Sequence, residues 1–221
     1  MNPENSDFYY DVLVVGGGLA ALSAAISAAD NGAAVLLVNK GITGNSGSSA
    51  KAAGILAAAF GHGDLETRPV PDNPNKHARD TLEVGYHIGD PELVNFVTKQ
   101  ATSAVQWLEN LGVEFSRAED NGYIQLNAPG NSCPRAVSAI GGGHAIVSAL
   151  LHQAKARGVV FLDQTIVKYI KPIEGHQFLV TLQGRQTITI AAGAAVLAAG
   201  GATGLFPTVS GDESNIGTSI M

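Results

Sequence analysis

The chain has 221 residues, a net charge of −6 and only 14% charged residues, which excludes the basic surface that nucleic acids or anionic membranes require. A single cysteine, Cys133, excludes an internal disulfide, and residues 1–10 (MNPENSDFYY) lack a secretion signal, so we expect a cytoplasmic protein. Apolar runs such as residues 52–60 and 191–200 contain glycine and are shorter than the roughly 20 residues that cross a bilayer, so we expect no membrane insertion.

The first predicted elements form a βαβ unit. Residues 11–15 (DVLVV) are an apolar run followed by glycines, which predicts a buried parallel strand. Residues 19–31 have the alanine and isoleucine spacing of a helix packed on a sheet, and Gly32 is placed to end it. Residues 34–39 (AVLLVN) predict the second strand.

The turn between the first strand and the helix carries Gly16, Gly18 and Ala21 in the spacing G-x-G-x-x-G/A. The first glycine permits the tight turn, the second lets a pyrophosphate approach the backbone, and the small third residue lets the helix pack on the strand. Free N–H groups at the helix start then face the phosphates. A glycine-rich turn in another α/β protein is the alternative, but the order of strand, motif, helix and strand favours a dinucleotide site.

The end of the second predicted strand leaves the kind of dinucleotide open. An acidic residue there usually binds the ribose hydroxyls, whereas this chain has Asn39 followed by Lys40. Asn39 can still hydrogen-bond a ribose. The alternative is that Asn39 only ends the strand and that backbone groups hold the ribose.

The middle of the chain is predicted to be an insertion, about residues 62–135, between the nucleotide-binding halves. Residues 90–92 (DPE) combine a capping acid, a first-turn proline and an early acid, which predicts a helix start, and Gly112 is placed to end that helix. Residues 69–75 (PVPDNPN) predict a surface loop.

The last third of the chain has the pattern of a β meander. Between residues 166 and 190, short apolar runs are separated by turns at residues 174–175 and 184–185. This pattern predicts small antiparallel strands that lead to a final parallel strand at residues 194–199.

Other candidate sites are weaker. Residues 48–51 match the nucleophile pattern S-x-x-K, but its companion motifs are missing. The histidines have no metal-ligand spacing, so no metal site is predicted. Arg135 could bind a carboxylate, but a structural or surface role is the commoner one. We expect His144 to cap or pack at a helix start and Trp107 to lie in the core, and we assign no catalytic residue.

Four stretches together resemble one known family. Residues 38–58, 112–130, 132–150 and 194–207 are similar, in order, to segments of the succinate dehydrogenase, fumarate reductase and L-aspartate oxidase flavoproteins. They match the serine-rich loop after the second strand, a G-V-x-F hairpin with Asn121-Gly122 as its turn, the approach to a Gly-His helix, and the A-T-G-G strand end that returns to the cofactor. The resemblance implies an α/β, Rossmann-like FAD-binding fold with a parallel sheet, a β meander and a helical and hairpin insertion.

The resemblance implies FAD and places residues around it. The glycines at the first turn would contact the pyrophosphate, and the end of the second strand would contact the adenosine ribose. The serine-rich loop would lie around the phosphates and the ring system. The backbone of residues 166–167 would meet the adenine edge, and residues 199–200 would close on the cofactor. The implied residues are Gly16, Gly18, Leu19, Ala20, Asn39, Lys40, Ser46, Gly47, Ser48, Ser49, Ala53, Gly54, Ile166, Val167, Ala199 and Gly200.

Two positions depart from the family pattern. Members with covalent flavin carry a histidine where this chain has Gly47, so we expect noncovalent FAD. The family's T-G-D-G segment aligns near residues 215–217 (NIG), where its aspartate corresponds to Ile216 unless Asp212 replaces it. One cofactor contact therefore remains open.

The resemblance covers essentially the whole chain and predicts an oxidoreductase that transfers hydride between FAD and a small carboxylate, of the fumarate, succinate or L-aspartate type. In the family a helix begins near residues 217–221 and a capping domain follows. We therefore expect an incomplete enzyme, residues 1–221 being its FAD-binding domain, with a possible second chain supplying the capping domain or electron transfer. The alternatives are a noncatalytic FAD- or NAD-binding module and an NAD-linked dehydrogenase fragment.

Overall fold

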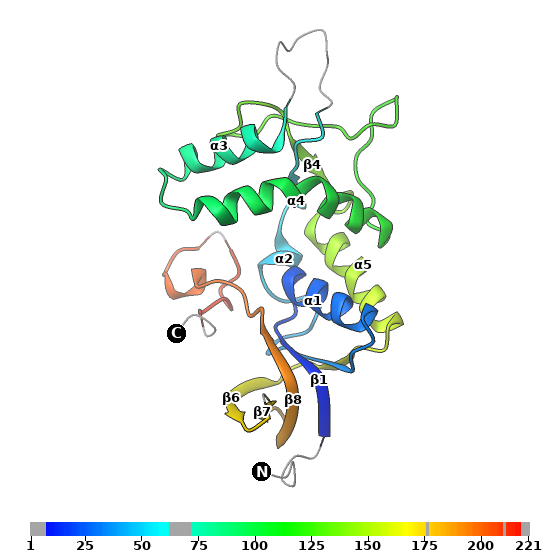
Figure 1. Ribbon diagram of the computed structural model, residues 1–221, viewed down its shortest axis with the longest axis vertical. Helices are drawn as coiled ribbons and strands as arrows, with labels where there is room; N and C mark the ends of the chain where they lie inside the picture. Colours follow the sequence, from blue (N-terminus) through cyan, green and yellow to red (C-terminus); the bar gives the residue numbers. More distant parts are fainter. Residues whose placement is uncertain (1–7, 62–71, 176, 210, 218–221) are drawn as a thin grey trace. The chain divides into compact units, whose positions relative to one another are not determined.

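The computed structural model describes residues 8–61, 72–175, 177–209 and 211–217 of an α/β chain. Two compact units share the chain: the first contains residues 1–52 and 146–221, and the second contains residues 53–145. Figure 1 labels most of their helices and strands. Residues 69–71 of the predicted loop and residues 218–221 of the predicted terminal helix lie outside the described residues.

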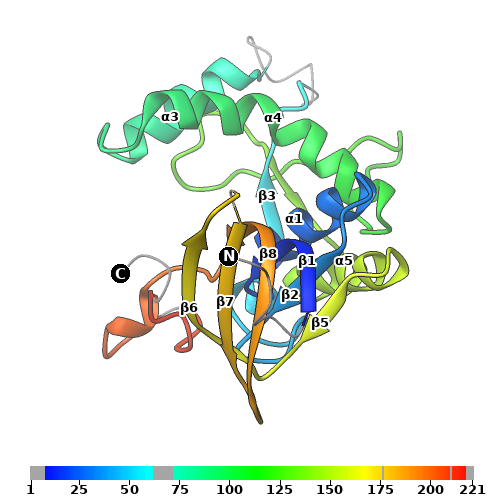
Figure 2. The ribbon, with the colours of Figure 1, turned by 60° about the horizontal axis from the view of Figure 1, so that its bottom comes forward.

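A six-stranded sheet organises the first unit, in the order β5-β2-β1-β8-β7-β6 (Figure 2). The first four strands in this order are parallel, and β8, β7 and β6 are antiparallel neighbours. Because β1 lies between β2 and β8, the carboxyl ends of these three strands meet at one edge, where α/β proteins bind ligands. The strand bounds are β1 Phe8–Val15, β2 Val35–Val38, β5 Val160–Leu162, β6 Ile166–Ile173, β7 Gln177–Gln183 and β8 Thr187–Leu197.

The predicted βαβ unit is confirmed. Helix α1 (Leu19–Asp30) packs on β1, β2 and β8 and ends at its cap, Asn31. Gly32 follows with φ +81, a left-handed conformation that favours glycine. Four α1 side chains are completely buried, which explains the small-residue pattern of this helix; they are Ala21, Leu22, Ala25 and Ile26.

The predicted meander is confirmed, with turns between β6 and β7 and between β7 and β8. The predicted final parallel strand at residues 194–199 is confirmed by its pairing with β1, but its bounds differ, because the strand begins at Thr187 and ends at Leu197. Residues 187–197 form one strand, in which residues 187–192 pair antiparallel with β7 and residues 190–197 pair parallel with β1. A buried apolar cluster joins the parallel and the antiparallel strands of the sheet, and it includes Leu13, Val180 and Ile190.

The second unit contains two helices that pack on each other, α3 (Pro74–Val84) and α4 (Pro91–Asn110). The predicted helix start is confirmed, because the Asp90 side chain accepts the N–H of Glu92 at 2.8 Å. The surface-loop prediction is wrong at its end, because Asn73 caps α3 through the N–H of Lys76 and Pro74 is the first helical residue. Strands β3 (Ile55–Ala57) and β4 (Ala136–Ser138) form an antiparallel pair.

The hairpin within residues 112–130 turns one residue earlier than predicted. Arg117 and Tyr123 bridge its two sides, and the N–H of Ala118 donates to the Gly122 carbonyl at 2.8 Å. The loop is therefore residues 119–121, with Asn121 in the left-handed region at φ 66. A three-residue loop that ends in a left-handed residue is a common hairpin connection.

Three shorter or shared elements complete the chain. Helix α2 (Ser48–Lys51) and the 3-10 turn η1 (Thr203–Leu205) belong to the first unit. Helix α5 (Gly142–Ala156) begins in the second unit and continues into the first. The Gly-His helix implied by the resemblance of residues 132–150 is thereby confirmed.

Candidate functional site

The first unit contains a cavity of about 1070 Å³ at the carboxyl ends of its parallel strands. This volume lies just above the usual range of small-molecule sites, about 300–1,000 Å³. Its lining comes mainly from six short segments, which are residues 15–20, 38–41, 46–49, 165–168, 197–201 and 214–216.

The glycine turn after β1 closes tightly onto backbone. Gly16 has φ +128, and a Cβ placed on it would stand 2.2 Å from the carbonyl oxygen of Ala198. The next residue, Gly17, has the side-chain amide of Asn39 at the same distance, 2.2 Å, from where its Cβ would be. Any side chain at either position would displace these neighbours. Because both residues are glycine, their backbone atoms line the cavity directly.

The start of α1 is prepared for an anion. Gly18 is its N-cap and supplies no side chain, and no acidic residue lies in the first turn. The N–H of Leu19 donates to the Ser49 hydroxyl oxygen at 3.1 Å. Because Ser49 accepts this bond, its own proton can be donated into the cavity. The helix dipole adds partial positive charge at the same point.

The end of β2 organises the serine-rich loop, residues 43–49. Asn39 is buried, and its amide nitrogen donates to the hydroxyls of Ser46 at 3.1 Å and Thr43 at 3.4 Å. Asp163, just after β5, accepts both the N–H and the hydroxyl of Thr43, at 3.0 and 2.6 Å. The Asn39 side chain is therefore engaged within the protein, and the geometry favours its structural role at the strand end.

The serine-rich loop also holds residues 211–217, which we name the rim segment. The Ser48 hydroxyl accepts the side-chain amide of Asn215 at 2.7 Å and the N–H of Asp212 at 3.2 Å. Lys51 forms an ion pair with Asp212 at 2.8 Å. Hydrogen bonds from Lys51 and then Ser214 lower the pKa of Asp212 far below its usual range, although burial opposes this. This carboxylate is therefore ionised at neutral pH.

The cavity lining is positive where it is charged. Among its described residues the charged side chains are Lys40 and Lys168, and none is acidic. Lys40 also donates to the carbonyl oxygen of Ser214 in the rim segment. In a chain whose net charge is −6, this local sign favours a negatively charged ligand.

All but two of the sixteen predicted cofactor residues line this one cavity. The exceptions, Ala53 and Gly54, belong to the second unit. A Cβ on Gly54 would stand 2.6 Å from the Cα of Gly142, so close backbone packing within that unit explains this glycine. Their contact with a cofactor remains a prediction.

Several lining residues were missed by the sequence analysis. Gly17 stands between the two motif glycines. Its close approach to the Asn39 side chain joins two strand ends, and no pattern in the neighbouring sequence predicts it. Lys168 and Thr203 line the cavity from positions far along the chain. Asn215 was noted only as a family position, and its bond to Ser48 joins residues 167 apart in sequence.

The S-x-x-K pattern has a structural explanation. Ser48 and Lys51 are the two ends of α2, and their polar groups bind Asn215 and Asp212 of the rim segment. No group of histidine, cysteine and acidic residues suited to a metal ion occurs within the described ranges.

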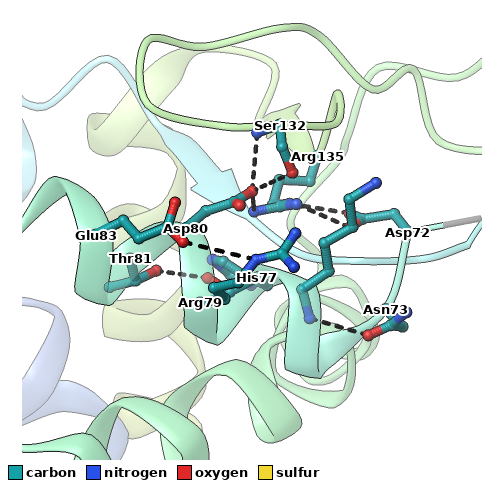
Figure 3. Close-up of polar contacts among 10 residues, drawn as sticks. Asp72, Asn73, His77, Arg79, Asp80, Thr81, Glu83, Ser132 and Arg135 are labelled. Carbon is teal, nitrogen blue, oxygen red and sulfur yellow. Dashed lines mark hydrogen bonds and ion pairs between the residues drawn. The ribbon is translucent and has the colours of Figure 1, made fainter.

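Arg135 is a buried structural residue of the second unit. Its side chain is 0% exposed and lies between two carboxylates, as Figure 3 shows. It donates to Asp72 at 2.8 and 2.9 Å and to Asp80 at 2.8 Å. Ser132 also donates to Asp80, through its N–H and hydroxyl. Burial raises the pKa of Asp80, but the hydrogen bonds from Ser132 and Arg135 outweigh this and lower it.

The sequence analysis singled out His144 and Trp107 but not His77. His77, beside Arg135, is buried, and its pKa is lowered by burial first and by the Arg135 charge second. Its Nδ1 has no hydrogen-bond partner in the part of the chain that the structure describes. His144 is exposed in the first turn of α5, which argues against packing, and Trp107 is half-buried on α4. No described helix is both long and apolar enough to cross a membrane.

Comparison with known proteins identifies the family of this chain. A protein-family model described as "FAD binding domain" matches residues 11–220. L-aspartate oxidase of Saccharolobus solfataricus is 32% identical over 212 residues, covering 95% of this chain and 40% of that protein. A fumarate reductase (CoM/CoB) subunit of Methanothermobacter marburgensis is 28% identical over 212 residues, covering 94% of this chain and 38% of that protein.

A solved structure agrees with the fold. The open conformation of a flavocytochrome c3 fumarate reductase aligns with a TM-score of 0.78 and 27% identity, covering 90% of this chain and 35% of that chain. The chain thus spans about two fifths of the length of the curated relatives named above, which are 40% and 38% covered.

Proposed function

This chain belongs to the FAD-binding domain family, and on that premise we propose that the cavity of its first unit holds FAD noncovalently. The observation that carries the proposal is the start of α1, where glycine backbone, an uncapped helix end and the Ser49 hydroxyl meet at the cavity. A pyrophosphate bound there would accept hydrogen bonds from the backbone N–H groups and be stabilised by the helix dipole. Gly47 offers no side chain for a covalent bond to the flavin.

The adenosine and the ring system of FAD would lie along the other segments that line the cavity. We assign the adenosine to the ends of β2 and the start of β6, where backbone and Lys40 are available. We assign the ring system to the serine-rich loop and to the chain after β8, where Gly200 has φ +85. The proposed contacts in the first unit are Gly16, Gly18, Leu19, Ala20, Asn39, Lys40, Ser46, Gly47, Ser48, Ser49, Ile166, Val167, Ala199 and Gly200. For Ala53 and Gly54, contact with FAD stays a prediction from the family resemblance.

The activity we propose is oxidoreduction of a small carboxylate substrate, of the fumarate, succinate or L-aspartate type. FAD supplies the hydride acceptor or donor, and the protein supplies binding, orientation and electrostatics. The relatives named fumarate reductase and L-aspartate oxidase support this class of reaction. We assign no catalytic residue to this chain.

We further propose that residues 1–221 act as the FAD-binding domain of a larger assembly. The insertion, about residues 62–135, would belong to this domain. A capping domain and an electron-transfer partner would come from further polypeptide, either in the same protein or in a second chain. The single, buried Cys133 supports a reducing compartment, and we propose the cytoplasm.

Purification of the chain tests the cofactor. We expect yellow protein whose flavin, identified as FAD by chromatography, is released into the supernatant by acid precipitation. Colourless protein that takes up NADH would instead support an NAD-binding module, and flavin that stays with the precipitate would contradict noncovalent binding. Succinate, fumarate or L-aspartate added to the loaded protein should give no steady turnover, because the proposed capping domain is needed for it.

A further inference from the structure

The rim segment, residues 211–217, forms one side of the cavity through Ser214, Asn215 and Ile216. Backbone hydrogen bonds join it to the chain after β8. The N–H of Gly204 donates to the Asn215 carbonyl at 2.8 Å, and the N–H of Gly217 donates to the Gly201 carbonyl at 3.1 Å. A Cβ on Gly204 would stand 2.1 Å from the Glu213 carbonyl oxygen, so these two stretches pack backbone to backbone.

The rim segment is also held to residues 40–51 by side chains. Lys40 binds the Ser214 carbonyl, Ser48 accepts two bonds, and Lys51 pairs with Asp212. Residues 40–51 and the rim segment are more than 160 positions apart in sequence, and both contribute to the cavity lining. A ligand in the cavity would therefore lie between two segments that these contacts hold together.

The contact between Lys51 and Asp212 differs from the others in two ways. It is an ion pair between two side chains, and neither residue lines the cavity. Asp212 is 7% exposed at its side chain while Lys51 is 65% exposed, so the carboxylate is the buried partner and depends on the lysine for its charge balance. The other Asp212 oxygen accepts the N–H of Ser214 at 2.8 Å, which couples the carboxylate to the rim backbone.

We propose that Lys51 and Asp212 form an electrostatic latch that holds the rim segment against α2 and so slows release of the ligand from the cavity. Asp212 is a positioning residue in this scheme: it orders Ser214 and Asn215, and these face the ligand. The latch itself concerns only residues of this chain. Its effect on FAD rests on the proposed function above.

Replacing the exposed partner weakens the latch without removing a cavity residue. Lys51→Met keeps most of the side-chain length and leaves Asp212 with the Ser214 N–H alone. Because the pair is part-buried, we expect a change somewhat above that of an exposed ion pair, about three- to tenfold. Lys51→Arg retains the charge and serves as the conservative variant. Arg79→Met is the matched control, since Arg79 pairs with Glu83 at 3.8 Å on the surface of the second unit, both being about 60% exposed.

The test is hydrogen–deuterium exchange of the flavin-free chain, read on peptides that contain residues 211–217. We expect about three- to tenfold faster exchange in Lys51→Met, and wild-type exchange in Lys51→Arg and Arg79→Met. Unchanged exchange in Lys51→Met, with an unchanged circular dichroism spectrum as a check of folding, would overturn the latch. This measurement needs no cofactor, so it stands even if the chain proves not to bind FAD.

A second measurement addresses the ligand. FAD is loaded into each variant, and its release after rapid dilution is followed by the change in flavin fluorescence. We expect release to quicken in Lys51→Met by the same factor as the exchange. Faster exchange with unchanged FAD release would overturn the role of the latch in retaining the cofactor. Failure of wild-type protein to take up any FAD would instead contradict the proposed function.

Discussion

The carbonyl oxygen of Ala198 lies where a side chain on Gly16 would begin, 2.2 Å from the position of its Cβ. The N–H of Ala198 also donates to the Val15 carbonyl at 2.8 Å, which holds β8 against the turn after β1. Gly16→Ala should therefore force this backbone apart and strain φ +128. We expect a loss of about 3 kcal/mol in the free energy of unfolding, or failure to fold, measured by urea denaturation.

Gly201→Ala is the control for that substitution. Gly201 also lines the cavity, but a Cβ added there would meet nothing within 4 Å. Its free energy of unfolding should stay within about 0.5 kcal/mol of wild type. Equal losses in the two variants would show that the Ala198 contact is unimportant.

Ser49 links the start of α1 to the proposed phosphate position. Its hydroxyl accepts the Leu19 N–H at 3.1 Å and retains a proton to donate to an anion. Ser49→Ala should weaken FAD binding by about 1–1.5 kcal/mol, roughly tenfold in Kd, measured by fluorescence titration. Ser27→Ala, on an exposed position of the same helix, should leave Kd unchanged; equal affinity in both variants would remove Ser49 from the site.

Arg135 balances two buried carboxylates in the second unit. Asp72 and Asp80 have side chains that are 5% exposed, so Arg135→Leu leaves their charges without a partner. We expect about 3–5 kcal/mol of destabilisation at pH 7, by urea denaturation. Arg79→Leu removes an arginine that is 62% exposed and should cost well under 1 kcal/mol.

The cost of Arg135→Leu should depend on pH. In wild type the pKa of Asp80 is lowered, so its contribution is present above the unfolded pKa, about 4, and is lost as the pH falls through the lower folded value. In Arg135→Leu we expect the pKa of Asp80 to rise relative to wild type, because the hydrogen bond and charge of Arg135 that lower it are lost. Protonation of Asp80 at low pH then removes its unpaired charge from the folded protein. The stability difference should therefore shrink between pH 7 and pH 4. A constant difference would contradict the assigned charges.

Substitutions at Asn121 and Gly122 distinguish the observed three-residue loop, residues 119–121, from the two-residue turn predicted from sequence. Asn121 has φ 66, whereas Gly122 does not have a positive φ. Asn121→Ala should therefore cost about 1 kcal/mol of stability, and Asn121→Gly should cost nothing. For Gly122→Ala the nearest contact of the added Cβ is the Asp120 side chain at 3.1 Å, so we expect a smaller loss. A larger loss at Gly122 in thermal melts would restore the two-residue turn predicted from sequence.

Elements that depend on neighbouring residues were predictable. The βαβ unit, the capped start of α4 and the meander turns all follow from local rules: apolar periodicity, side-chain capping and the turn preferences of glycine. The cavity could also be located in advance, because the carboxyl ends of adjacent parallel strands meet at one edge.

The boundaries were less predictable. Residues 187–197 form one strand with two kinds of partner. No property of the local sequence records that pairing with β1 begins at Ile190 or that pairing with β7 ends at Ala192. The Asn121-Gly122 dipeptide is a strong hairpin signal, but the bridge between Arg117 and Tyr123 sets the loop one residue earlier. Cross-strand pairing decided both cases.

By itself, then, the sequence of this protein determined a glycine turn before a helix and the strands on either side, because short-range sterics and hydrogen bonding act within a few residues. Only the tertiary structure decided which distant groups meet: Ala198 at Gly16, Asp72 and Asp80 at Arg135, Asp212 at Lys51. Those contacts depend on packing across the sheet and between loops, where charges and backbone must find partners once water is excluded.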